Sequence, residues 1–275
     1  MDIDHTDSIS ISIRKNIFRS FFSKSAYTNT MKTDQNLAVL IDADNIPSAY
    51  VKEMMEEIAK YGKPTVKRIY GDWTKPQVTK WKNILLENAL SPIQQYGYTT
   101  GKGATDSAMI IDAMDILYSD KVDGFCIASS DSDFTRLAMR LREAGKHVIG
   151  IGEKKTPEPF IVACDRFIYL EILKVQNEEE TKPGKKTKTS KETIDSISVK
   201  LIQTLRTTID DLADEDGWAY LGDVGNLLQK KQPNFDARNY GFQKLTRLID
   251  STGKFEIEKR ENQKGRFKLM YVKNK

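Results

Sequence analysis

Strand-like and helix-like segments alternate through most of this 275-residue chain, and that alternation restricts its possible folds more than any other feature. Short apolar runs that suit buried strands occupy residues 37–44, 65–72, 92–98, 123–131, 147–152 and 166–173. Segments with helical spacing occupy residues 48–61, 78–90, 105–118 and 134–144. This pattern predicts an α/β fold in which a mostly parallel sheet carries helices on both faces.

Acidic residues follow several of the predicted strands at the point where each strand ends. Ligands of open parallel sheets bind at that edge, so we expect these side chains to converge. Carboxylates held close together repel one another, and a hard divalent cation such as Mg²⁺ is the usual compensation. The acids are Asp42 and Asp44, Asp72, Asp131 and Asp133, with Asp106 at the start of a helix. The sequence therefore predicts a metal site.

Each acid also has a simpler interpretation, because an Asp at a strand-to-helix junction is a good helix N-cap. Asp44 and Asp133 both stand at such junctions. Asp112 and Asp115 lie at least one helical turn beyond Asp106, and they suit a solvated helix face as well as a supporting role behind a metal. Four separate strand-end acids taken together favour a metal site over four unrelated caps.

Composition excludes several classes of protein. The net charge is +4, and there are only two histidines and two cysteines. A disulfide framework and a Cys-rich zinc site are therefore excluded, and chemistry that needs two imidazoles is disfavoured. No apolar run approaches the roughly 20 residues of a membrane-spanning helix. The segment GYTTGKGATD is rich in glycine but lacks the spacing of a P-loop.

Two polar segments flank the predicted α/β domain at 37–175. Residues 1–36 are polar and are expected to form a disordered N-terminal extension. Three early aspartates argue against a transit peptide, and the absence of an apolar signal segment in this stretch argues against secretion. We accordingly expect a cytoplasmic protein. Residues 176–193, QNEEETKPGKKTKTSKET, have almost nothing apolar to bury and are expected to form a flexible linker to a second domain at 194–275.

Three segments of the first domain resemble one family. They are LIDADN, KGATDSAMIIDAM and CIASSDSDFTRLAMRLREAGKHVIGIG. Together they resemble the NYN domain, a branch of the PIN-like ribonuclease superfamily that includes LabA-like and limkain-type proteins. The resemblance implies a PIN-like fold and a metal-dependent nuclease, with Asp42, Asp106, Asp131 and Asp133 as catalytic residues. It implies Asp42, Asp106, Asp131 and the more variable Asp72 as ligands of Mg²⁺ or Mn²⁺.

The segment from Trp218 to Ile249 resembles the LOTUS domain, also called OST-HTH, a winged-helix-like module that binds RNA or protein partners. An amphipathic helix is expected before it, over 197–212, and a β-hairpin wing after it. Basic residues accompany these elements, although interspersed acids allow an ordinary solvated surface as well. Our RNA-binding candidates are Lys102 and Arg136 in the first domain, and Lys230, Lys231, Arg238, Lys244 and Arg266 in the second.

The sequence thus predicts a ribonuclease that hydrolyses RNA phosphodiesters, with single-stranded RNA as the expected partner and an RNA-binding or adaptor module at its C-terminal end. One alternative is a non-catalytic RNA-binding or scaffold protein that keeps the acids for structure. Another is a haloacid-dehalogenase-like phosphatase, suggested by the Asp-x-Asp of LIDADN. The later motifs of that phosphatase class do not appear in convincing form, so we favour the ribonuclease.

Overall fold

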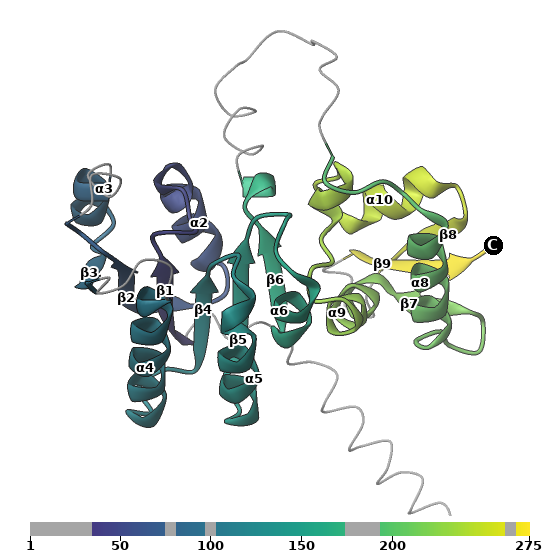
Figure 1. Ribbon diagram of the computed structural model, residues 1–275. Helices are drawn as coiled ribbons and strands as arrows, with labels where there is room; N and C mark the ends of the chain where they lie inside the picture. Colours follow the sequence, from purple (N-terminus) through teal and green to yellow (C-terminus); the bar gives the residue numbers. More distant parts are fainter. Residues whose placement is uncertain (1–34, 75–80, 97–102, 174–192, 262–267) are drawn as a thin grey trace, which may run out of the picture.

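The first domain is built on a six-stranded sheet in the order β3-β2-β1-β4-β5-β6, and every neighbouring pair is parallel. The computed structural model describes residues 35–74, 81–96, 103–173, 193–261 and 268–275 (Figure 1). The strands are β1 (Asn36–Asp42), β2 (Lys63–Gly71), β3 (Ser91–Gln94), β4 (Gly124–Ala128), β5 (His147–Gly152) and β6 (Arg166–Tyr169). The predicted α/β class with its parallel sheet is confirmed.

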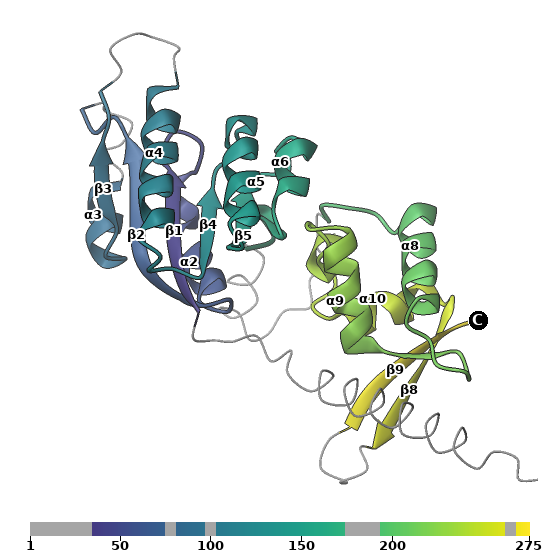
Figure 2. The same cartoon turned by 90° about the horizontal axis from the view of Figure 1, so that it is seen from below.

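Helices cover both faces of this sheet. One face packs against α2 (Val51–Ile58), which follows a short 3-10 turn η1 (Ser48–Tyr50), and against α3 (Trp81–Glu87). The other face packs against α4 (Ala104–Tyr118), α5 (Thr135–Glu143) and α6 (Glu158–Ala163). Figure 2 shows α4, α5 and α6 along the same side of the sheet. Within the described residues, no helix combines the length and apolar character needed to cross a membrane.

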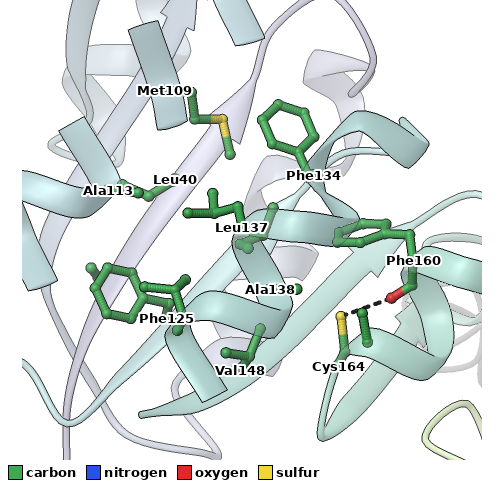
Figure 3. Packing of buried hydrophobic residues seen from close by; sticks show 14 of the residues in the cluster. Leu40, Met109, Ala113, Phe125, Phe134, Leu137, Ala138, Val148, Phe160 and Cys164 are labelled. Atoms are coloured by element: carbon green, nitrogen blue, oxygen red, sulfur yellow. Dashed lines mark hydrogen bonds between the residues drawn. The ribbon is translucent and has the colours of Figure 1, made fainter. Parts of the chain in front are cut away.

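The central strand β4 is buried along its whole length, as a strand covered on both faces should be. Its side chains alternate between two cores, with Phe125 and Ile127 in one and Cys126 in the other. Figure 3 shows the first core, where Phe160 packs beside Cys164, whose thiol donates a hydrogen bond to the Phe160 carbonyl at 3.3 Å. Burial raises the pKa of Cys164 to about 12, so this thiol is inert and structural.

The second domain is a small helical unit closed by an antiparallel sheet in the order β7-β9-β8. Its core includes Leu205, Val224, Leu248 and Val272, all fully buried. The elements are α8 (Val199–Asp210), β7 (Trp218–Tyr220), α9 (Leu221–Lys231), η4 (Ala237–Tyr240), α10 (Leu245–Thr252), β8 (Phe255–Glu261) and β9 (Lys268–Asn274). The winged-helix-like arrangement with a β-hairpin wing is confirmed.

The structure also departs from the sequence prediction in three places. The last strand of the large sheet ends at Tyr169, and residues 171–173 are helical rather than extended. The short helix α6 and the strand β7 were not predicted. Both have at most six residues, which is too short for a hydrophobic period to appear in the sequence. Residues 1–34 of the expected extension and most of the expected linker lie outside the described residues, and Asn36 already begins β1.

The two domains are in direct contact, and an ion pair joins them. Arg238 of η4 donates to both carboxylate oxygens of Glu57 in α2, at 3.0 and 2.7 Å, and the Glu57 side chain is only 3% exposed. Burial alone raises the pKa of Glu57, but hydrogen bonds from Arg238 and Lys60 outweigh it and lower the pKa to about 2. The ion pair therefore joins the two domains through residues that are 181 positions apart in sequence.

Further contacts fix the second domain against the edge strand β6. The Phe167 amide donates to the carbonyl of Pro233 at 2.8 Å, and Asn234 donates its side-chain amide to the Tyr169 hydroxyl at 3.0 Å. Arg166 pairs with Asp236 at 3.3 Å. An uncovered edge strand invites association with other chains, so this docking also protects the sheet.

Replacing Arg238 tests the domain contact. In Arg238→Ala the Glu57 carboxylate stays buried without its main partner, and we expect the free energy of unfolding to fall by about 3 kcal/mol. Urea unfolding measures the loss, and small-angle scattering should show a larger radius of gyration as the domains separate. Arg140→Ala, on an exposed position of α5, is the control. Equal stability and equal size in the two variants would contradict the contact.

Candidate metal centre and active site

The site is organised around a carboxylate that is fully buried at the end of β1. Asp42 accepts hydrogen bonds from the Asn45 side-chain amide at 2.6 Å, from the Ser129 hydroxyl at 2.9 Å and from the Asp44 backbone amide at 3.0 Å. Burial raises the pKa of Asp42, and these hydrogen bonds oppose that rise. Since Ser129 directly follows β4, the Asp42–Ser129 bond ties together the ends of two neighbouring strands.

Three further carboxylates meet beside this anchor. Asp106, Asp131 and Asp133 each present an oxygen, and the three oxygens lie within 4.8 Å of one another. Asp106 stands in the first turn of α4, whereas Asp131 is the N-cap of the 3-10 turn η3 (Ser132–Phe134) that follows β4, and Asp133 lies within that turn. Two separate segments therefore deliver like charges to one place at the carboxyl edge of the sheet.

The electrostatics of this cluster are unfavourable without a cation. The pKa of Asp106 is raised to about 6, first by its burial and then by the charges of Asp42, Asp131, Asp133 and Asp44. Asp42 therefore lies close enough to influence Asp106, although it is not one of the three acids whose oxygens gather within 4.8 Å. The cluster has the properties of an anionic site built to receive positive charge.

The donor set fits a hard divalent cation. Three carboxylate oxygens are the ligand type that Mg²⁺ and Mn²⁺ prefer, and the gathered side chains are half-buried or exposed, so water can fill remaining positions. Asp131 also caps η3 by accepting from the Asp133 backbone amide at 2.9 Å. One of its oxygens therefore serves the cap, so that the cap and ligand interpretations of Asp131 are compatible.

The structure places Asp72 outside the three-acid cluster. Its Oδ1 accepts from the Thr74 hydroxyl at 2.6 Å and from the Gln94 side-chain amide at 3.0 Å. Gln94 ends β3, the edge strand that pairs with β2. The Asp72 carboxylate thus joins the ends of β2 and β3, and its role as a metal ligand stays a prediction.

Two other acids occupy different positions from the cluster. Asp112 accepts from both Arg68 and Tyr70, so it serves the packing of α4 on β2. Asp44 is exposed and accepts from the Thr105 hydroxyl at 3.4 Å. Its charge contributes to the raised pKa of Asp106, so Asp44 adds to the negative electrostatic potential at the site.

Sequence reasoning missed Ser129, whose hydroxyl binds Asp42 and accepts from the Asp131 backbone amide at 3.1 Å. A small hydroxyl residue placed directly after β4 in CIASSDSD was the available signal.

The predicted RNA-binding residues fall into four groups. Arg136 is exposed in the first turn of α5, just beyond the acids, and Lys230 and Lys244 are exposed on the second domain. Lys231 is exposed but pairs with Asp211 at 2.7 Å. Arg238 is occupied by the contact with Glu57, and its side chain is only 14% exposed. Lys102 and Arg266 lie outside the described residues.

Protonation of the cluster should be visible in the stability of the metal-free protein. The folded pKa of Asp106 lies above its unfolded value, so the folded state binds more protons and stability falls as pH rises from about 4 to about 6. We expect Asp106→Asn to flatten this fall and Mn²⁺ to reverse it in the wild type. Thermal melting in EDTA and in Mn²⁺ measures both effects. Asp115→Asn, an exposed acid on the same helix, should behave like the wild type.

Two known domain families match this chain. The NYN domain family matches residues 36–171, and the OST-HTH/LOTUS domain family matches residues 191–267. A solved protein of unknown function from Vibrio parahaemolyticus is 18% identical, covering 50% of this chain and 93% of its own, with a TM-score of 0.42. An uncharacterised protein from Nitrosomonas europaea is 28% identical, and the match covers 34% of this chain and 90% of that protein, with a TM-score of 0.28.

No curated protein matches the chain. The family matches follow the same order as the two folded units, and the chain belongs to the proteins that join an NYN domain to an OST-HTH/LOTUS domain.

Proposed function

We propose that this protein is a divalent-metal-dependent ribonuclease. The observation that carries the proposal is the meeting of Asp106, Asp131 and Asp133 within 4.8 Å at the carboxyl edge of the sheet. The membership of the NYN domain in the PIN-like nucleases supports the same conclusion. A cluster of unpaired carboxylates destabilises the fold by itself, which argues that it is kept for binding a cation.

Each residue of the site then has a defined task. Asp106, Asp131 and Asp133 hold Mg²⁺ or Mn²⁺, while Asp42 stays fixed by Ser129 and Asn45 and adds negative charge behind them. A cation bound here would activate water and neutralise charge on the phosphodiester under attack. Arg136 is exposed beside η3, and we assign it to the phosphates next to the scissile bond. We assign Lys102 to the same task.

The second domain serves as the RNA-binding module in this proposal. Lys230 and Lys244 are exposed on it and are available to phosphates. Because the domain is docked on β6 and α2, it presents RNA in a fixed orientation to the first domain.

Cleavage of a labelled single-stranded RNA tests the proposal directly. We expect cleavage with Mn²⁺ or Mg²⁺, none in EDTA, and none with Asp131→Asn in either metal. Asn also serves as an N-cap, so this variant removes the charge while the cap of η3 survives. Asp115→Asn should cleave like the wild type. Cleavage in EDTA, or by Asp131→Asn, would contradict the mechanism, and a wild type that binds RNA without cleaving it would favour a scaffold.

Ser129→Ala tests whether the buried anchor positions the acids. The variant removes a hydroxyl that holds both Asp42 and the Asp131 backbone, without touching an acid. Supporting residues of this kind typically change metal affinity by roughly 10- to 100-fold. The Mn²⁺ concentration that gives half-maximal cleavage should therefore rise by about that factor. Ser132→Ala, an exposed serine in η3, is the control, and identical Mn²⁺ dependence in the two variants would refute the anchor role.

A further inference from the structure

The small sheet of the second domain presents an outer face that its helices do not cover. Alternation along the strands sends Ala219, Ile257 and Val272 inward to the core. The opposite face carries Trp218 and Tyr220 of β7, Arg260 of β8, and Tyr271 and Lys273 of β9. In Figure 2 the strands β8 and β9 lie on one side of this domain, with α9 and α10 on the other. We call these five outer side chains the aromatic face.

The rings of the aromatic face form a continuous row with a guanidinium in it. The Arg260 guanidinium lies 4.7 Å from the ring centroid of Tyr271 and 4.9 Å from that of Trp218. The rings of Tyr220 and Tyr271 are neighbours, with centroids 5.8 Å apart. Lys273 lies 6.0 Å from the Trp218 ring, and its amine donates to the carbonyl of Asp216 at 2.8 Å. A packed core does not explain this row, because its members lie on the solvent side.

The charge of the surrounding segment favours an anionic partner. Residues 254–275 carry eight basic and three acidic side chains, for a net charge of +5. Arg260 pairs with Glu258 at 2.9 Å and is 35% exposed. Arg260 also lies 4.0 Å from the Asp214 carboxylate. A guanidinium has five N–H donors, so these two carboxylates orient it against the rings and still leave donors for other acceptors.

The row continues into a groove between the domains. This groove has a volume of about 750 Å³, and Tyr220 and Lys268 line it from the second domain. Tyr61 and Arg166 line it from the first domain, and the Arg166 guanidinium lies 4.9 Å from the Tyr61 ring centroid. This second arginine–tyrosine pair belongs to the domain contact, because the Arg166 side chain is only 12% exposed and pairs with Asp236.

We propose that the aromatic face is a stacking platform for the bases of single-stranded RNA. Every base has a π-face, and single-stranded bases stack on aromatic rings and on guanidinium planes. Rings alone would suit an apolar protein segment equally well, but the arginine, the lysines and the net positive charge favour a polyanion. The inference rests on the proposed ribonuclease function and adds where its substrate is held.

The experiment measures binding of a fluorescent 15-nucleotide oligouridine to the full chain by anisotropy, in EDTA so that no cleavage occurs. We expect Tyr271→Leu to weaken Kd by roughly 5- to 150-fold, the range for losing one base stack. The slope of log K against log salt should stay unchanged, because no phosphate contact is removed. Arg260→Gln should weaken Kd and also reduce that slope. Tyr118→Leu, on a tyrosine that is 72% exposed on α4, should bind like the wild type.

A backbone of equal length without bases separates stacking from charge. The wild type should bind this abasic oligonucleotide weakly. Tyr271→Leu should bind it with the same Kd as the wild type, because there is no base to stack on the ring. Thermal melting checks that each variant is folded. If folded Tyr271→Leu and Arg260→Gln bind the oligouridine with unchanged Kd, the stacking platform is wrong. If the wild type binds no RNA at low salt, the platform is also wrong, and a protein partner is favoured instead. A wild type that binds through these residues but never cleaves would overturn the ribonuclease alone.

Discussion

The hydrogen bond between Asp42 and Ser129 is the constraint on which the rest of the site depends. It joins the ends of β1 and β4, the two central strands of the sheet, through a carboxylate that is fully buried. Ser129 also accepts from the backbone amide of Asp131, so the anchor fixes the turn that carries Asp131 and Asp133. A buried polar group must be hydrogen-bonded to be tolerated, and here that requirement sets the geometry of the whole cluster.

Two acids in this protein show what a positive partner does to a buried carboxylate. Glu57 is bound by Arg238 from the other domain, and its pKa falls to about 2. Asp106 is half-buried among other acids, and its pKa rises to about 6. The first arrangement stabilises the contact between domains, whereas the second lowers stability at neutral pH. Under the proposed function the cluster serves a bound cation, whereas the Glu57 pair holds the two domains together.

The sequence was sufficient where local pattern determines structure. The strands of the large sheet and the meeting of Asp106 with Asp131 follow from hydrophobic alternation and from the rule that strand ends face one edge. The sequence was insufficient where the role of a residue depends on a partner that is distant along the chain. Asp72 is held by Gln94 from β3, and Arg238 by Glu57 across the domain contact. No local spacing encodes either partner, because the strand order and the docking arise only in the folded chain.

The central claim is that Asp106, Asp131 and Asp133 bind a divalent cation, and anomalous diffraction from a crystal soaked in Mn²⁺ tests it most directly. Data collected at the manganese edge locate the ion independently of any assay of activity. The account predicts a peak within coordination distance of carboxylate oxygens of all three acids, and its loss in Asp131→Asn crystals. A clear map with no peak there, or a peak that persists in Asp131→Asn, would contradict it.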